Sequence, residues 1–288
     1  YLIVKRKIIN YNPDYLYQSG AGFITWVLSK IAKKNGIIFI HRIANDIDTD
    51  IRINSKLGFI SKFFYLNGLK NADIILCQNK VQQHNIKKKY KCKITYIIHN
   101  PIEIQKKAKI KNIKRRYIAW LGIFQHQKNL PGLFFIAKTL PMYEFKVAGT
   151  ISKSENSIRI KNQIKELQTL PNIKFVGFIP RNEISSFLGD AYLLLNTSFY
   201  EGFSNTFLES FRSGTPVVTT KKVDPDNIIE KNKLGLVGEK IKDLPEFIIR
   251  IINKSENKDF SDNCISYVFR NHDRNMLAEK LLSFLIKK

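Results

Sequence analysis

The sequence has no apolar run that is long enough to cross a membrane as a helix. A spanning helix needs roughly 18 to 20 consecutive apolar residues, and the longest candidate is broken by Lys30, Lys33 and Lys34. A signal peptide is missing as well, because three basic residues interrupt the apolar residues of 2–9. The chain opens on Tyr1 without a methionine, which suggests a truncated start. These features favour a soluble or peripheral membrane protein.

Cysteine is scarce, with only Cys77, Cys92 and Cys264 in the chain. Their number is odd and their spacing matches no metal-ligand pattern, which argues against a disulfide framework and against a zinc site. A reducing cytoplasm fits this usage, so we expect a cytoplasmic protein.

Carboxylates are scarce in the first part of the chain. Residues 1–116 carry 24 Lys and Arg against 6 Asp and Glu, a net charge of +18, whereas residues 117–288 carry 24 against 18, a net charge of +6. A surface this basic should attract an anionic partner, either a membrane leaflet or nucleic acid. Alternatively, the basic residues reflect only the overall composition of the protein, since the whole chain is rich in Ile, Lys and Asn. The densest run, Lys87–Lys89 with Lys91 and Lys93, is either a phosphate or lipid headgroup site or a solvated face.

The chain does have the length and composition of two ordinary globular domains. Its 288 residues are 44% hydrophobic and 25% charged, which suits two domains that each bury a core. Short apolar runs alternate with helix-like stretches, with Gly and Pro between them. This alternation predicts an α/β protein with parallel sheets in both halves.

The most informative stretch is 192–220. An apolar run at 192–195 precedes a polar loop that contains a glycine, and an amphipathic stretch begins at Thr206. Gly214, Thr215 and Pro216 then lead into a second β-branched run. This order predicts the strand, loop, helix and strand of a βαβ unit. Ligands of parallel sheets bind outside the carboxyl ends of the strands, so the loop before the helix is the candidate site.

Two glutamates, Glu201 and Glu209, flank this loop with seven residues between them. A glycine lets the backbone approach a ligand closely, and the N–H groups at a helix start favour an anion such as phosphate. An ionised carboxylate accepts hydrogen bonds from two hydroxyl donors. The implied ligand carries both phosphate and hydroxyls, as a nucleotide sugar does.

Each glutamate also has a plainer interpretation. With Thr206 as the N-cap, residues 206–209 form a capping box in which Glu209 only satisfies a backbone N–H of its own helix. Glu201 would otherwise be a solvated loop charge, and the whole stretch an ordinary α/β crossover.

The stretch EGFSNTFLESFRSGTPVV resembles the Glu-x7-Glu signature of the family 4 retaining glycosyltransferases. The resemblance implies the GT-B fold, an α/β architecture of two Rossmann-like domains whose parallel sheets face a central cleft. It also implies that Glu201 contacts the donor hexose and that Glu209 holds the ribose hydroxyls of the nucleotide. The residues between them, whose amides would reach the sugar and the diphosphate, are Gly202, Phe203, Ser204, Asn205 and Thr206.

A second segment resembles the family's diphosphate clamp. Gly122 is present and Lys128 lies at the position of the family's lysine, but Ile123 replaces its arginine. Half of the clamp is missing, which leaves open a pseudoenzyme that has lost transfer. By the same resemblance, Phe178 and Ile179 are candidate contacts of the donor base, with core packing as the alternative for both.

In the first domain, Asn45, Asp46 and Asp48 follow a predicted strand at 37–43 and match the family's acceptor side. Many members have a catalytic histidine there. His41 is the candidate for that role, unless it is a buried strand residue and Asn45 or Asp46 occupies the histidine position. Asp46 and Asp48 either position an acceptor hydroxyl or are solvated loop acids.

The resemblance sets the domain limits and the expected activity. Residues 1–112 form an acceptor-side domain that is incomplete at its start and is completed by the helix 275–288, and residues 113–274 form the donor domain. The expected reaction moves a hexose from a UDP- or GDP-linked sugar to a glycan or lipid-linked hydroxyl acceptor with retention, in cell-surface polysaccharide or lipid-linked glycan synthesis.

For such an enzyme, the anionic inner face of the membrane is a more natural partner than nucleic acid. No metal and no cofactor are implied, and the candidate catalytic residues are Glu201, Lys128 and His41. Two other functions compete with this one. The first is a basic module that binds nucleic acid or anionic lipid without transfer, and the second is a nucleotide-sugar epimerase, which can share this fold.

Overall fold

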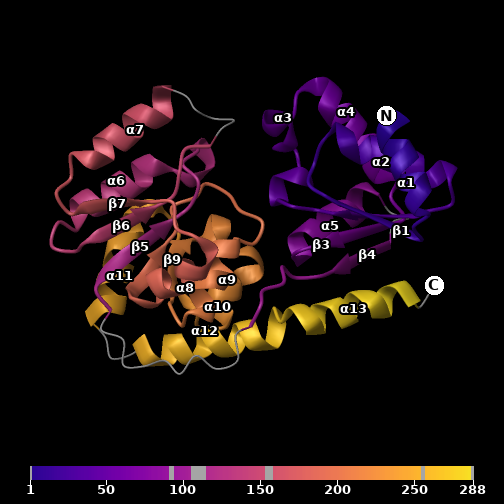
Figure 1. The fold of residues 1–288 in the computed structure, drawn as a ribbon. Helices are drawn as coiled ribbons and strands as arrows, with labels where there is room; N and C mark the ends of the chain where they lie inside the picture. The colour runs from indigo at the N-terminus through magenta and orange to yellow at the C-terminus, as the bar shows by residue number, and fades with distance from the viewer. Residues whose placement is uncertain (1, 91–93, 105–114, 153–157, 254–256, 287–288) are drawn as a thin grey trace. The chain divides into compact units, whose positions relative to one another are not determined.

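A computed structural model describes residues 2–90, 94–104, 115–152, 158–253 and 257–286 of the chain. The chain divides into two compact units, Tyr1–His99 (unit 1) and Asn100–Lys288 (unit 2). Figure 1 shows that each unit has its own sheet with helices packed on it. The boundary predicted between residues 112 and 113 lies outside the described residues.

Unit 1 is built on a four-stranded parallel sheet with the strand order β1-β2-β3-β4. Because strands that are consecutive in the chain are neighbours, each crossover moves one place along the sheet. The elements are α1 (Leu2–Tyr11), β1 (Tyr15–Ser19), α2 (Phe23–Lys34), β2 (Ile38–Arg42), η1 (Asp46–Asp48), α3 (Ile53–Lys56), α4 (Phe59–Asn71), β3 (Ile74–Cys77), α5 (Lys80–Lys89) and β4 (Ile94–Ile97).

Helices α2 and α4 of unit 1 pack very closely. A Cβ added at Gly68 of α4 would lie 2.8 Å from backbone atoms of both Thr25 and Trp26 on α2, so glycine is required for this approach. The core of the unit includes Phe39 of β2 and Tyr65 of α4, both fully buried. The two helices therefore form one rigid surface over their sheet.

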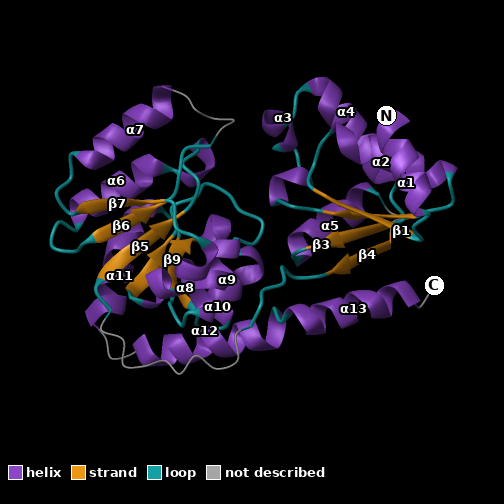
Figure 2. Ribbon diagram, viewed as in Figure 1, coloured by secondary structure: helices purple, strands orange, loops and turns teal. Residues whose placement is uncertain are grey.

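Unit 2 contains a six-stranded parallel sheet with helices around it, as Figure 2 shows. Its elements are β5 (Tyr117–Leu121), η2 (His126–Lys128), α6 (Leu130–Thr139), β6 (Phe145–Ala148), α7 (Ile158–Gln168), β7 (Ile173–Gly177), α8 (Arg181–Gly189), β8 (Ala191–Leu195), α9 (Asn205–Arg212), β9 (Val217–Thr220), η4 (Lys221–Val223), η5 (Pro225–Asn227), α10 (Ile228–Lys231), β10 (Gly235–Gly238), η6 (Ile241–Asp243), α11 (Leu244–Asn253), α12 (Asn257–Asn271) and α13 (Arg274–Ile286).

The strand order of unit 2, β10-β9-β8-β5-β6-β7, has a switch point between β5 and β8. From β5 the chain adds β6 and β7 on one side, then returns to add β8, β9 and β10 on the other. Such a reversal leaves a crevice at the carboxyl ends of the two strands that flank it, and open α/β sheets bind ligands there. The segments that follow β5 and β8 are therefore the place for a ligand in this unit.

The patterns of short apolar runs predict most strands correctly. The strand expected at 192–195 is confirmed as β8, and the short apolar runs at 74–77 and 117–121 form β3 and β5. The final helix, expected at 275–286, is confirmed as α13, whereas α12 was not predicted. A helix expected from residue 154 is described from Ile158 onward as α7, and residues 153–157 lie outside the described part.

Two expectations from composition can be compared with the structure. None of the helices in the described ranges has the length and apolar character needed to cross a bilayer. Cys77 and Cys264 are buried free thiols. Cys92 lies outside the described residues.

Candidate active site

The candidate site of unit 2 lies beside the switch point. Strand β5 leads into η2, which ends at Lys128, and β8 leads into the loop that carries Glu201. Because the carboxyl ends of neighbouring parallel strands meet at one edge, these two residues meet although 73 positions separate them in the chain. The position agrees with the site predicted from the sequence.

Hydrogen bonds tie the two segments to each other. The Phe199 N–H donates to the Gln127 carbonyl over 2.9 Å, and the Thr197 hydroxyl donates to the Lys128 carbonyl over 2.8 Å. The indole N–H of the buried Trp120 on β5 donates to the same hydroxyl over 3.2 Å. The backbone under the site is therefore fixed before any ligand binds.

Glu201 and Lys128 form an ion pair in which the Lys128 Nζ lies 2.6 Å from the Glu201 Oε1. Their side chains are only 9% and 12% exposed. The Ser198 hydroxyl donates to the same carboxylate oxygen over 2.9 Å, and the Gln127 amide donates to Oε2 over 3.1 Å. Glu201 is thus a buried and paired carboxylate, and its interpretation as a solvated loop charge is wrong.

This arrangement suits a ligand that carries both phosphate and hydroxyl groups. An ammonium has three N–H donors, and the ion pair with Glu201 uses one of them. Lys128 can bind phosphate oxygens with the others, while the carboxylate accepts hydrogen bonds from ligand hydroxyls. The buried pair also holds each charge at a defined place, since removing either partner would leave the other unpaired.

Two glycines allow the chain to pack tightly beside Lys128. A Cβ at Gly122 would lie 3.3 Å from the Lys128 Cε. Gly149, just after β6, has φ +145°, and a Cβ there would lie 1.8 Å from the Gly122 carbonyl oxygen. A side chain at residue 149 would displace the Gly122 segment. Gly122 is therefore next to Lys128 as predicted, and its contact with a donor stays a prediction.

Helix α9 begins at Asn205, with Ser204 as its N-cap. The capping-box interpretation of Glu209 is therefore wrong, because it required Thr206 at the N-cap. The Thr206 hydroxyl instead lies 2.8 Å from the Ser204 hydroxyl. Burial raises the pKa of the Glu209 carboxyl, against the effect of two nearby arginines. Without a capping role, Glu209 keeps its predicted role toward the ribose.

The loop that contains Gly202 is braced by residues that the sequence does not connect with it. The Asn100 amide donates to the Phe203 carbonyl over 3.0 Å and to the Asn205 side-chain oxygen over 3.1 Å. The His272 ring stacks on the Phe203 ring at 5.3 Å, and its Nδ1 lies 2.8 Å from the Asn100 carbonyl oxygen. The Phe203 side chain belongs to the core, so only its main chain can meet the predicted donor.

Three apolar residues near the predicted donor site differ in exposure. Ile179 is 9% exposed and belongs to the core, as the packing alternative expects. Phe178 is 72% exposed, so core packing does not explain it and it can stack on a base. Ile123, at the position of the family's arginine, is 52% exposed.

His41 lies inside β2 with no exposed surface, as the buried-strand interpretation expects. Burial lowers the pKa of its imidazole to about 3, so the ring is neutral at physiological pH. Its Nδ1 lies 2.7 Å from the Gln18 side-chain oxygen. A ligand cannot contact the ring in this position, and the predicted catalytic role gains no support from it.

The three acceptor-side candidates follow β2 as predicted, but their side chains bond within the protein. Asn45 caps η1 and forms a capping box with Asp48, which is 2% exposed. Asp46 accepts hydrogen bonds from the amides of Asn79 (2.9 Å) and Gln82 (2.7 Å). Burial raises the pKa of Asp46 although these two donors oppose the shift. Neither Asp46 nor Asp48 is therefore a simple solvated loop acid.

Four residues at the carboxyl edges of the two sheets are not singled out by the sequence: Gln127, Ser198, Asn79 and Gln82. Each contacts a predicted site residue, and three of the four do so across more than 30 residues of chain. Ser198 is the exception, because it lies in the loop that the βαβ pattern marks as the ligand site.

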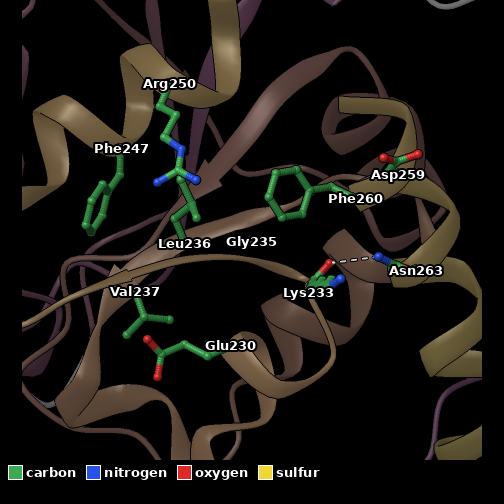
Figure 3. Close-up of a pocket in the computed structure, with 10 residues that line it drawn as sticks. All are labelled: Glu230, Lys233, Gly235, Leu236, Val237, Phe247, Arg250, Asp259, Phe260 and Asn263. Carbon is green, nitrogen blue, oxygen red and sulfur yellow. Dashed lines mark hydrogen bonds between the residues drawn. The ribbon is translucent and has the colours of Figure 1, made fainter. Parts of the chain in front are cut away.

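A pocket of about 610 Å³ lies elsewhere in unit 2, between α10, β10, α11 and α12. Figure 3 shows Arg250 between the rings of Phe247 and Phe260, with Glu230 and Asp259 on opposite sides. None of the predicted site residues lines this pocket. Over the described ranges, no group of His, Cys, Asp or Glu is placed to hold a metal ion.

Residues 101–285 match the family model described as glycosyl transferases group 1. The chain belongs to this family. The match includes the whole Lys128–Glu201 site and α13, and the GT-B fold predicted from the signature is the fold that the structure has.

Two curated proteins are similar to the chain. One is the 2-deoxystreptamine N-acetyl-D-glucosaminyltransferase of Niallia circulans, which is 22% identical over 264 residues, or 83% of this chain and 66% of that protein. The other is the O-antigen chain mannosyltransferase B of Escherichia coli, which is 24% identical over 181 residues, or 60% of this chain and 46% of that protein. The chain thus spans less than two thirds of the length of either relative.

Solved structures share the fold at low sequence identity. Sucrose-phosphate synthase from Thermosynechococcus elongatus has a TM-score of 0.82 at 15% identity, over 99% of this chain and 76% of that chain. Anabaena HepE in complex with UDP-glucose has a TM-score of 0.80 at 15% identity, over 100% of this chain and 82% of that chain.

Proposed function

We propose that this protein transfers a hexose from a nucleotide-diphosphate sugar to a hydroxyl acceptor with retention of the anomeric configuration. We place the reaction in the synthesis of a cell-surface polysaccharide or a lipid-linked glycan. The observation that carries the proposal is the buried Lys128–Glu201 ion pair at the switch point of unit 2. Membership of the group 1 glycosyl transferases supports it.

The donor is held by residues of unit 2. Lys128 and the start of α9 bind the diphosphate, because an ammonium and the N–H groups of a helix start both favour an anion. Glu201 accepts hydrogen bonds from the hexose hydroxyls and Glu209 from the ribose. Phe178, which is 72% exposed, packs against the base.

The reaction breaks the bond between the sugar C1 and the diphosphate oxygen and forms a bond from C1 to the acceptor oxygen. The acceptor proton moves to the departing diphosphate on the same face of the sugar, which retains the configuration. Lys128 and the α9 start stabilise the charge that develops on the diphosphate. No metal is needed in this scheme, so transfer should persist in the presence of a chelator.

Titration calorimetry with a panel of UDP- and GDP-sugars tests the donor site. We expect one nucleotide sugar to bind, and binding should weaken at least about tenfold in Lys128→Met, since a charge-assisted contact is lost. Lys174→Met is the matched control, because Lys174 forms an exposed ion pair with Glu144. Binding of no nucleotide sugar would refute the proposal.

A module that binds anionic lipid or nucleic acid without transfer is the second candidate. Ile123 favours it, because an exposed apolar side chain stands where the family's second cation binds the diphosphate. Analysis of products distinguishes the candidates: a glycosylated acceptor with the donor's anomeric configuration supports the transferase, and a bound but unreacted donor supports the module.

A further inference from the structure

The α-helices of unit 1 carry basic residues and no carboxylates. Over the described residues, α1 to α5 contain 13 Lys and Arg but no Asp or Glu. By contrast, α7 to α13 of unit 2 each contain at least one Asp or Glu. The α-helices of unit 1 therefore carry a positive charge that no carboxylate on the same helices offsets.

Large apolar side chains are exposed on α2 and α4, as others are on α1 and α5. On α4, Phe59 is 85% exposed, Ile60 70% and Phe63 57%. On α2, Phe23 is 47% exposed and Ile24 44%. An exposed apolar patch of this kind on a soluble unit marks a surface that another partner covers.

The rings of this patch are continuous across the two helices. Phe23 of α2 meets Phe64 of α4 edge to face at 4.9 Å, and Trp26 lies 4.7 Å from the same ring. Phe63 continues the cluster at 5.6 Å from Phe64. Because Gly68 lets α2 and α4 pack at backbone distance, the cluster is held as a preformed surface. We refer to it as the α2–α4 face.

The face lies at the starts of its helices. Phe23 is the first residue of α2, four residues after the end of β1, and Phe59 is the first residue of α4. In a parallel sheet, helices start beside the carboxyl ends of the strands. The α2–α4 face therefore lies at the same edge of the unit 1 sheet as Asp46, which follows β2, and Figure 1 shows α2 and α4 side by side there.

Lysines occur on the same helices as the exposed rings. Lys62 is next to Phe63 on α4, and Lys70 lies in the last turn of the same helix. The positive charges of Lys62 and Lys70 lower the pKa of Lys89, in addition to the effect of its partial burial. The Lys89 ammonium is therefore repelled by those of Lys62 and Lys70, and an anionic surface would relieve this repulsion.

We propose that the α2–α4 face docks on an anionic lipid bilayer, with Phe59, Ile60 and Phe63 inserted among the headgroups and the lysines against lipid phosphates. A bilayer surface accepts aromatic and aliphatic side chains together with basic ones. Nucleic acid would neutralise the lysines but leave the Ile60 and Phe59 side chains in water. The inference rests on the proposed function for its choice of a lipid-linked acceptor, which this docking would bring to the edge that holds Asp46.

Sedimentation with vesicles tests the docking. The full chain is mixed with vesicles of phosphatidylcholine alone or of phosphatidylcholine with phosphatidylglycerol. We expect binding to the anionic vesicles only, weakened by salt. The triple variant Phe59→Ser/Ile60→Ser/Phe63→Ser should bind about 100-fold or more weakly, because three large apolar side chains no longer enter the interface. Lys62→Glu/Lys70→Glu should bind about tenfold or more weakly.

Phe269→Ser is the matched control, since Phe269 is 65% exposed on α12 of unit 2, and it should bind vesicles as the wild type does. Failure to bind anionic vesicles, or undiminished binding of the triple variant, overturns the inference. So does preferential binding of a single-stranded oligonucleotide in a polarisation assay. Calorimetry of the triple variant with nucleotide sugars keeps the two proposals separate, because donor binding should be unchanged there whether or not the bilayer is bound.

Discussion

The two units hold polar side chains at the carboxyl edges of their sheets in different ways. In unit 2, Lys128 and Glu201 come from different strands and pair as opposite charges in a largely buried place. In unit 1, Asp46 and Asp48 accept hydrogen bonds from side-chain amides and a backbone N–H. The first edge thus holds a buried pair of opposite charges, and the second holds carboxylates that are paired with neutral donors of the protein. The strong charge of unit 1 lies on its helices instead.

Breaking the pair in unit 2 should have the largest effect on stability. Lys128→Met or Glu201→Gln leaves one buried group without its partner and should lower the free energy of unfolding by about 3–5 kcal/mol. The double variant Lys128→Met/Glu201→Gln should recover much of this loss, since no charge is then left unpaired. Denaturant unfolding of the two single variants and the double variant measures the coupling.

The exposed pair of Lys174 and Glu144 is the control for this cycle. Lys174→Met should change stability by about 1 kcal/mol or less, because solvent screens exposed pairs. Equal losses for Lys128→Met and Lys174→Met would mean that the buried pair is no more important than a surface one.

One buried group in each unit should also make the stability of its unit depend on pH, and the two dependences have opposite directions. His41 in unit 1 has a pKa of about 3 when folded and an ordinary value near 6.5 when unfolded, because burial disfavours its charged form. Its contribution to stability is complete above pH 6.5 and is lost as the pH falls from 6.5 toward 3, by a few kcal/mol at about 1.4 kcal/mol per pKa unit. His41→Phe should remove this slope.

Asp224 in unit 2 is 3% exposed, and burial raises the pKa of its carboxyl to about 6, against a hydrogen bond from the Ile229 N–H. The folded form keeps its proton where the unfolded form has lost it, so unit 2 loses stability as the pH rises from about 4 to 6. Asp224→Asn should flatten this change. Trp26→Phe leaves Trp120 as the fluorescent reporter of unit 2. If the contributions of His41 and Asp224 to the free energy of unfolding changed with pH in the same direction, the comparison would be contradicted.

Removing the hydrogen bonds that hold the Gly202 loop should weaken nucleotide-sugar binding moderately, and the change should be confined to unit 2. Asn100→Ala removes the donors to Phe203 and Asn205 and should weaken nucleotide-sugar binding by about tenfold, the value of one or two lost hydrogen bonds. His272→Phe keeps the stacked ring and should have a smaller effect. An unchanged dissociation constant in Asn100→Ala would show that the brace does not position the donor site.

Adding the family's missing arginine should give the smallest change in nucleotide-sugar binding, and it should strengthen the binding. Ile123 is 52% exposed, so Ile123→Arg can be accommodated, and its guanidinium should tighten diphosphate binding by up to about tenfold. Ile158→Arg is the control, because Ile158 is 79% exposed on α7. The same gain from both arginines would reflect net charge rather than a clamp.

The sequence predicts the framework of unit 2 well because its strands are short apolar runs with clear breaks. The strand at 192–195, the loop and the strand after Pro216 follow from pattern alone, and so does the position of Glu201 after β8. The start of α9 does not follow, since Thr206 and Glu209 match a capping box as well as Ser204 suits the N-cap. Contacts from distant parts of the chain, such as Asn100 to Asn205, accompany the actual start.

Partners that are far apart in the chain could not be predicted. No local pattern links Gln127 to Glu201, or Asn79 to Asp46, because the parallel strands bring them together only after folding. For His41, the local sequence pattern itself is ambiguous. Both faces of β2 are covered, so polar and apolar residues of this strand are buried alike and the pattern cannot separate a catalytic histidine from a core one.

The most direct test of the donor site is a calorimetric titration of UDP and of the best-bound nucleotide sugar into the double variant Lys128→Met/Glu201→Gln. This variant removes the charged pair and should stay folded, which thermal unfolding can verify. We predict that it loses measurable binding while the wild type and Lys174→Met bind alike. Wild-type affinity in the folded double variant would contradict the assignment of the donor site to the switch point of unit 2.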